Sequence, residues 1–347
     1  MRCQTEIDFV VTWVDGADPA WRREKDAYGS NSDGDDRPGA DRPLEDIGDV
    51  RYRDNGLLRY WFRGVEKFAP WVRRIHFVTW GHIPPWLNVD DKKLNIVRHE
   101  DFIPEEFLPT FNSNAIELNL HRIEGLSEHF VYFNDDVFPI RNMKESDFFR
   151  DGKPCDMLAF QPVVANPENP VMSHTFLNNS LVISKHFDKR ENVKKQPGKY
   201  FKVGYPPLYF FYNLLELAFP KYTGFYTVHG PAPLCRQTYR DVWEMEPQKL
   251  KETSLHKFRC EDDVSIYLIR DWQKLTGNFR PRNLLSDFAF FSLGNDNIKL
   301  YKTVTGRKKK VVCINDADEK YDFENVKREL TEVFEKILPE RSAFEKP

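Results

Sequence analysis

Short apolar runs recur along the first half of the chain and predict the strands of a buried sheet. The runs Ile7–Trp13, Ile75–Thr79, Leu94–Val97 and Phe130–Phe133 are rich in β-branched and aromatic residues. They alternate little with polar residues, which is typical of strands covered on both faces, as in a parallel sheet.

Between these runs, apolar residues recur at the spacing of helices. Leu57–Phe68 and Asn114–Leu126 each carry such a stripe, and Asp54 is a plausible cap for the first helix. Strands that alternate with helices form right-handed βαβ units. We therefore expect an α/β fold: a mostly parallel, Rossmann-related sheet flanked by helices, with insertions.

The rest of the chain is less regular. We expect a mobile surface loop at about Gly29–Asp49, where Gly, Asp, Ser and Pro dominate, and a basic loop at Asp188–Lys202. The pattern predicts strands at Asp156–Gln161 and Asn179–Ile183, and helices at Leu208–Phe219, Asp262–Leu275 and Phe323–Leu338. We divide the chain into a main domain, residues 1–280, and a C-terminal extension, residues 281–347, with the basic run Arg307–Lys310 and the terminal helix.

Composition excludes several classes of protein. A net charge of −3 with interspersed signs argues against a nucleic-acid binder. The five cysteines are scattered and odd in number, which suits a reducing cytosol better than a disulfide framework. No apolar run approaches the ~18–20 residues that cross a bilayer. We expect a cytoplasmic protein, with the inner face of the membrane as an alternative place.

The first candidate for chemistry is Asn134-Asp135-Asp136, directly after the strand Phe130–Phe133. In open α/β sheets, ligands bind beyond the carboxyl ends of the strands. Carboxylates there can hold Mg²⁺ or Mn²⁺ against a diphosphate. The alternative is an ordinary type I turn, in which Asn and Asp are common.

Three further polar positions could act with these acids. Glu117 and His121 lie one helical turn apart and could supply a base or a hydrogen bond, or they could be a solvated i,i+4 pair. His229, in TVHGPAPLC, suits proton transfer or contact with a phosphoryl oxygen, although a lone histidine is more often an ordinary loop residue. Arg259, at the start of a helix, suits phosphate binding or a surface ion pair equally well.

Four stretches resemble the signature regions of the Stealth family. They are IDFVVTWVDG; the run from RDNGLLRYWFRG to FVYFNDDVF; FLNNSLVISKHF with TVHGPAPL; and HKFRCEDDVSIYL. They are spread over most of residues 7–275. The family includes bacterial capsular-polysaccharide phosphotransferases and the catalytic subunit of the lysosomal-enzyme N-acetylglucosamine-1-phosphotransferase. The chain lacks the large insertions of that lysosomal relative.

The resemblance implies a GT-A-like catalytic domain, a reaction and a set of site residues. Members transfer sugar-1-phosphate from a UDP-sugar to an acceptor hydroxyl, release UMP and use Mg²⁺ or Mn²⁺. The implied catalytic residues are His229, Asp135, Asp136, Glu117 and Arg259, of which Asp135 and Asp136 would hold the metal. The implied nucleotide-sugar contacts are Trp13, Val14, Asp15, Gly16, Asn134, His121 and Asp263, the last as the residue that orients Arg259.

The expected function is metal-dependent transfer of a hexose-1-phosphate, such as N-acetylglucosamine-1-phosphate, to a glycan hydroxyl in capsule or cell-surface polysaccharide synthesis. The partners are then a UDP-sugar donor and a glycan acceptor. Two alternatives stay open: a conventional GT-A glycosyltransferase that releases UDP, and a carbohydrate-binding protein without catalysis. The terminal helix could be core, a dimer contact or, with Arg307–Lys310, a membrane-surface or capsule-complex contact.

Overall fold

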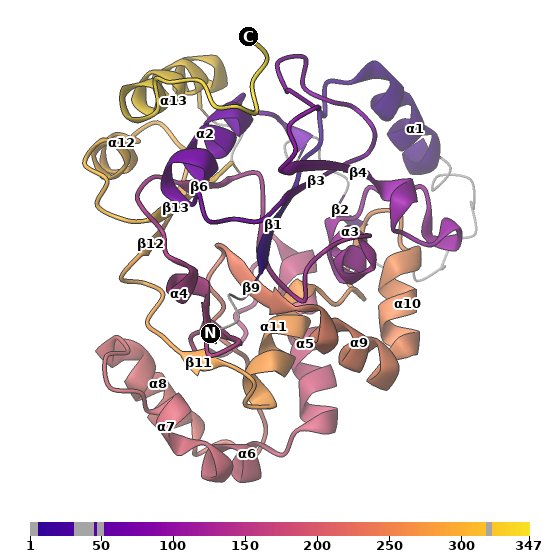
Figure 1. Ribbon diagram of the computed structural model, residues 1–347. Helices are drawn as coiled ribbons and strands as arrows, with labels where there is room; N and C mark the ends of the chain where they lie inside the picture. The colour runs from indigo at the N-terminus through magenta and orange to yellow at the C-terminus, as the bar shows by residue number, and fades with distance from the viewer. Residues whose placement is uncertain (1–5, 31–44, 47–51, 317–320) are drawn as a thin grey trace.

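A five-stranded sheet in the order β4-β3-β1-β5-β9 lies at the centre of the computed structural model (Figure 1), which describes residues 6–30, 45–46, 52–316 and 321–347. The middle strand β1 (Ile7–Thr12) is parallel to β3 (Ile75–Thr79) and β5 (His129–Phe133). β4 (Leu94–Arg98) continues the parallel order, and β9 (Ala232–Cys235) pairs antiparallel with β5. The predicted α/β fold with a mostly parallel sheet is confirmed, and the four strands predicted in the first half of the chain are present.

The side chains of β1 alternate between two hydrophobic cores, because successive residues of a strand point to opposite faces. Phe9 and Val11 enter one core and Val10 enters the other. The first core is shared with α2 (Leu58–Phe68), α12 (Ile298–Thr305), α13 (Phe323–Ile337) and a sheet of β12 (Phe288–Ser292), β13 (Val311–Asn315) and β6 (Val137–Pro139). The second is shared with α3 (Ser113–Asn119), α5 (Pro170–His186), α9 (Arg236–Met245), α10 (Pro247–Leu255) and α11 (Ile266–Leu275).

The C-terminal residues pack as part of the main body, so the structure does not divide the chain near residue 280. β13 pairs antiparallel with β6, and the terminal helix α13 buries Leu330 and Phe334 in the first core. Both Nε and Nη2 of Arg63, in α2, donate to the carboxylate of Glu345, at 2.7 and 2.9 Å. Of the alternatives for the terminal helix, core is the one observed. Lys310 of the basic run also turns inward and bonds the Asp147 carboxylate at 2.8 Å.

The predictions for residues 141–230 were partly wrong. Asn179–Ile183 lies within α5, whose buried side chains recur at helical spacing at Val171, Thr175, Asn179 and Val182, so it is helical and not a strand. The expected basic loop forms α6 (Lys189–Lys195) and α7 (Pro197–Tyr200), whereas the helix expected near Leu208 is confirmed as α8 (Pro207–Glu216). The strand expected at Asp156–Gln161 is displaced: β8 covers Lys153–Asp156.

The remaining elements are short or peripheral. They are α1 (Pro19–Ser30), β2 (Glu45–Asp46), α4 (Glu145–Phe148), β7 (Phe149–Arg150), β10 (Arg259–Cys260), β11 (Arg280–Pro281) and 3₁₀ turns at His99–Asp101, Glu105–Phe107 and Leu120–Arg122. Most of the expected loop at Gly29–Asp49 lies outside the described residues. Among the described helices, none combines the length and the apolar character needed to cross a bilayer.

Candidate active site

A cavity of about 260 Å³ opens beyond the carboxyl ends of β1 and β5. It lies at the edge of the sheet where ligands bind in open α/β folds. β1 contributes Thr12 and continues into Trp13 and Val14, while β5 leads into the turn Asn134–Asp136. Helix α3, the loop with His229, β10 and the end of β13 supply the other polar walls, with Ser113, Glu117, His229, Arg259, Asn315 and Asp316.

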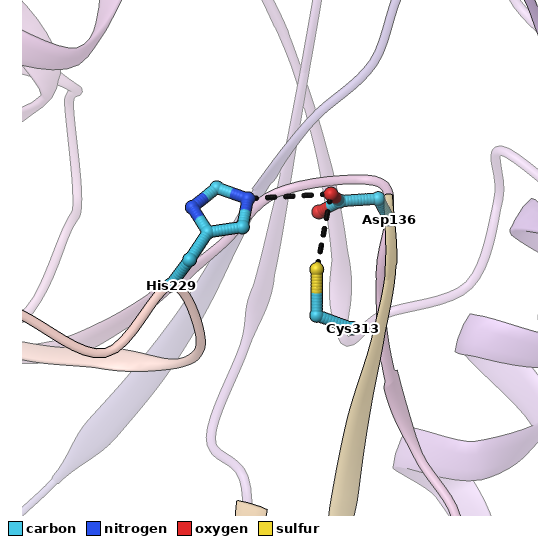
Figure 2. A group of neighbouring side chains, drawn as sticks. All are labelled: Asp136, His229 and Cys313. Carbon is cyan, nitrogen blue, oxygen red and sulfur yellow. Dashed lines mark hydrogen bonds and ion pairs between the residues drawn. The ribbon is translucent and has the colours of Figure 1, made fainter. Parts of the chain in front are cut away.

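Asp136 lies at the centre of a small polar cluster (Figure 2). Its Oδ2 is 3.2 Å from His229 Nε2 and also accepts a bond from the Cys313 thiol at 3.2 Å. The other ring nitrogen of His229 bonds the Tyr267 hydroxyl at 2.9 Å. Burial disfavours the charged imidazole, but Tyr267 and the Asp136 carboxylate outweigh it and hold the pKa of His229 well above its ordinary value. The pairing of ring and carboxylate favours the protonated imidazole.

The two acids of the turn suit a hard cation. Asp136 Oδ1 is buried and has no hydrogen-bond partner among the described residues. Desolvation is the larger cause, and the negative charges of Asp136 and Asp54 are the next, of a rise in the pKa of Asp135 to about 8. The Asp135 side chain is exposed toward the cavity. Crowded carboxylates with a free oxygen are the donors that Mg²⁺ and Mn²⁺ prefer.

Glu117 enters the cavity from α3, close to the same acids. It is 6% exposed, and the Tyr132 hydroxyl donates to its Oε1 at 3.1 Å. Burial raises the pKa of Glu117 to about 7, against the opposing charge of Arg259. A carboxyl with such a pKa can take or release a proton near neutral pH.

Arg259 points its guanidinium toward the start of α3. Its Nε and Nη2 donate to the Ser113 hydroxyl at 2.9 and 2.5 Å. Among the described residues no carboxylate forms an ion pair with it, so the expectation that Asp263 orients Arg259 was wrong. Asp263 is fully buried behind the cavity wall, where it accepts bonds from Asn112, Asn114 and His256.

The cavity becomes aromatic where β1 ends. Trp13, Val14, Trp21, Tyr52 and Phe111 line this part. Asp15 and Gly16 line a second hollow that shares Trp21 and Tyr52 with the first. A methyl group on Gly16 would lie 2.0 Å from the Tyr52 carbonyl oxygen, so only glycine permits this close approach of the two segments.

His121 does not reach the cavity, and its expected contact with the nucleotide sugar was wrong. The expected helix Asn114–Leu126 ends as α3 at Asn119, and the 3₁₀ turn that follows carries His121 outward. There its ring stacks on Tyr239, with centroids 5.2 Å apart. Burial lowers the pKa of His121 to about 3, so it is a neutral packing residue.

The sequence analysis missed the residues that β13 brings to the site. Cys313 contacts Asp136, and Asp316 receives both Nε and Nη2 of Arg53 at 2.8 and 2.7 Å. A signal was present, because the run from Val311 to Ile314 is apolar and leads into Asn315-Asp316. This is the same strand-end pattern that marked Asn134-Asp135.

Three models of the Stealth family match the chain. Conserved region 1 matches residues 5–33, conserved region 2 matches residues 51–156, and conserved region 4 matches residues 302–347. The fourth region was therefore misplaced at HKFRCEDDVSIYL, and the C-terminal residues belong to the family pattern. This agrees with the packing, in which β13 forms a wall of the cavity.

Similarity to solved structures is low. An active-site mutant of LgtC covers 94% of this chain and 95% of its own, at 13% identity and a TM-score of 0.38. Mouse xyloside xylosyltransferase 1 covers 89% of this chain and 98% of its own, at 11% identity and a TM-score of 0.34.

Similarity to curated proteins is high and extends over the full length. The capsular polysaccharide phosphotransferase WcwK of Streptococcus pneumoniae is 38% identical over 348 residues, which cover 100% of both chains. The exopolysaccharide phosphotransferase cps2G of Lactiplantibacillus plantarum is 36% identical, over 98% of this chain and 96% of its own. The receptor polysaccharide phosphotransferase WefC of Streptococcus oralis is 36% identical, over 98% and 99%. This chain therefore belongs to the Stealth family of polysaccharide phosphotransferases.

Proposed function

We propose that this enzyme transfers a sugar-1-phosphate, such as N-acetylglucosamine-1-phosphate, from a UDP-sugar to a hydroxyl of a cell-surface polysaccharide. The acceptor oxygen bonds to the β-phosphorus, and the bond between that phosphorus and the bridging oxygen breaks. UMP leaves with the bridging oxygen, and the acceptor proton passes to a carboxylate of the cavity. The product is a phosphodiester between sugar and glycan.

The observation that carries this proposal is the meeting of acids, an imidazolium and a guanidinium in one cavity. Phosphoryl transfer depends mainly on positioning and on charges placed around the phosphorus. His229 lies in the loop before β9 and Arg259 lies in β10, and both side chains line the cavity. The family relationship supports the same reaction class, since the relatives named above are polysaccharide phosphotransferases.

Each wall of the cavity then has a role. His229, as an imidazolium, and Arg259 contact phosphoryl oxygens, and the aromatic part near Trp13 takes the uracil ring. Glu117, whose pKa is raised to about 7, can take the acceptor proton.

The proposed cofactor is Mg²⁺ or Mn²⁺, held by Asp135 and Asp136. When bound, such a cation neutralises charge on the diphosphate and on the leaving UMP. The Cys313 thiol donates to the Asp136 carboxylate at 3.2 Å. The carboxylates of Asp135 and Asp136 offer oxygen donors, which fit these hard cations.

Nucleotide release tests the reaction. The purified enzyme is incubated with UDP-N-acetylglucosamine, Mg²⁺ and a polysaccharide acceptor, and nucleotides are separated by chromatography. UMP is the expected product, formed together with a phosphodiester in the glycan, and EDTA abolishes it. Release of UDP would contradict the proposal and support a conventional glycosyltransferase, and absence of both products with several UDP-sugars would support a binding protein.

Variants test the site independently of the product. Asp135→Asn, Asp136→Asn and His229→Ala each lower kcat by about 100-fold or more, because each removes a charge placed at the reacting group. Asp262→Asn is the matched control: Asp262 is exposed and does not line the cavity. If all three variants matched this control, the residue roles would be wrong even with UMP as the product.

A further inference from the structure

Helix α8 is amphipathic, but it buries polar side chains and exposes apolar ones, which is the reverse of an ordinary surface helix. Of its ten residues, only two, Asn213 and Glu216, are buried, and both are polar. Asn213 bonds the backbone of Leu158, Phe160 and Tyr200 at 2.6 to 3.1 Å. Glu216 accepts bonds from Lys189 and from Thr223. The helix is therefore fastened to the protein through hydrogen bonds on its inner side.

The outer side of α8 and the turn after it are apolar. At 3.6 residues per turn, the exposed positions cover the half of the helix opposite Asn213 and Glu216. They are Leu208, Phe210, Phe211, Leu214 and Leu215, followed by Leu217 and Phe219, with exposed fractions between 41% and 53%. Ordinary surface helices turn such residues inward, and a contiguous exposed patch of this kind marks an interaction site.

The charge around this surface is positive. From Asp188, the cap of α6, to Lys221 the chain carries seven basic residues and three acids. Of the acids, Glu216 is buried and Glu191 lies 3.6 Å from Lys195, so the net charge of this segment is positive. Lys194, Lys195 and Lys221 are exposed. Figure 1 shows α6, α7 and α8 as an arc along the lower edge of the molecule, at a distance from the central sheet. Apolar and basic side chains therefore lie together on one projecting edge.

We propose that α8 and the lysines around it form a foot that binds the surface of an anionic lipid bilayer. An interfacial helix inserts its apolar side between the headgroups, and nearby lysines bind anionic lipids. A second copy of this chain suits the surface less well. A two-fold contact brings two copies of the same basic surface together, and their like charges disfavour that approach. This inference does not rest on the reaction proposed above.

Flotation with lipid vesicles tests the foot. Wild-type protein is expected to float with vesicles of phosphatidylglycerol and phosphatidylcholine, and to bind pure phosphatidylcholine vesicles less. The triple variant Phe210→Ser/Phe211→Ser/Leu215→Ser loses binding by about tenfold or more, since it removes three of the seven exposed apolar side chains. The triple variant Lys194→Gln/Lys195→Gln/Lys221→Gln loses the preference for anionic lipid and its sensitivity to salt.

A control variant distinguishes binding through α8 from non-specific binding of vesicles by other exposed apolar side chains. Met245→Ser/Ile298→Ser removes apolar side chains that are 51% and 57% exposed on other helices, and it is expected to float like the wild type. Unchanged melting temperatures confirm that the variants are folded. Equal flotation of the α8 variant and this control would overturn the proposal. So would a wild-type dimer, measured by light scattering, that becomes a monomer in the α8 variant and binds no vesicles in either form.

Discussion

Replacing Arg270 by methionine removes one half of a buried ion pair beside the active site. The side chains of Arg270 and Asp156 are 1% and 2% exposed. Nε and Nη2 of Arg270 each donate to the Asp156 carboxylate at 3.1 Å, and Nη1 donates to the Val228 carbonyl oxygen at 2.9 Å. Val228 precedes His229, so Arg270 links the stability of the core to the position of the imidazole.

The expected loss follows from the charge that is left behind. In Arg270→Met, Asp156 keeps the amide of Met157 as a donor but loses its counter-charge. Removing one partner of a buried pair costs roughly 3–5 kcal/mol. At about 2 °C per kcal/mol for a large domain, the melting temperature falls by about 6–10 °C. The double variant Asp156→Leu/Arg270→Met removes both charges and regains most of this loss, because apolar replacements of a buried pair are often neutral.

Activity behaves differently from stability in these variants. Both lack the donor to the Val228 carbonyl, so both are expected to lose kcat, while KM for the UDP-sugar changes little. Calorimetry and initial-rate kinetics measure the two effects. Arg280→Met is the matched control, since its pair with Asp151 is exposed and is worth less than about 1 kcal/mol. An unchanged melting temperature in Arg270→Met, or full kcat in the double variant, would refute the reasoning.

Two further predictions concern the start and the end of β1. Burial opposes ionisation of Asp8, but bonds from His76, Arg73 and Ser127 prevail and lower its pKa. Its contribution is therefore complete above the unfolded pKa of about 4 and is lost as the pH falls through the lower folded value. At pH 7 the melting temperature of Asp8→Asn should be lower than that of the wild type, and below about pH 4 the two melting temperatures should converge. A difference in melting temperature that stays constant with pH would contradict this role of Asp8. Gly16→Ala places a methyl group 2.0 Å from the Tyr52 carbonyl oxygen, so it should destabilise the fold by about 1–3 kcal/mol and raise KM for the donor, unlike Gly198→Ala, which meets nothing within 4 Å.

Short sequence patterns predicted an element correctly where the residues before and after it do not favour a different secondary structure. The run Ile75–Thr79 is a strand in the structure because β-branched and aromatic residues covered on both faces have no alternative burial. The same reasoning failed at Asn179–Ile183. There, a short stretch lies within a 17-residue helix, and only the longer window from Pro170 shows that the buried positions recur at helical spacing. The prediction for His121 failed for a related reason, since α3 ends at Asn119, seven residues before the end that its apolar spacing suggested.

The sequence alone determined four of the five strands of the central sheet, the strand-end acids Asp135 and Asp136, and the family resemblance, because each of these lies in contiguous residues. Only the tertiary structure decided which distant groups join those acids. Cys313 reaches Asp136 across 177 residues because β13 pairs with β6, and Asp263 and His121 are withdrawn behind the wall by their own partners. Strand pairing at this separation depends on how the two cores close around the sheet, which no local pattern encodes.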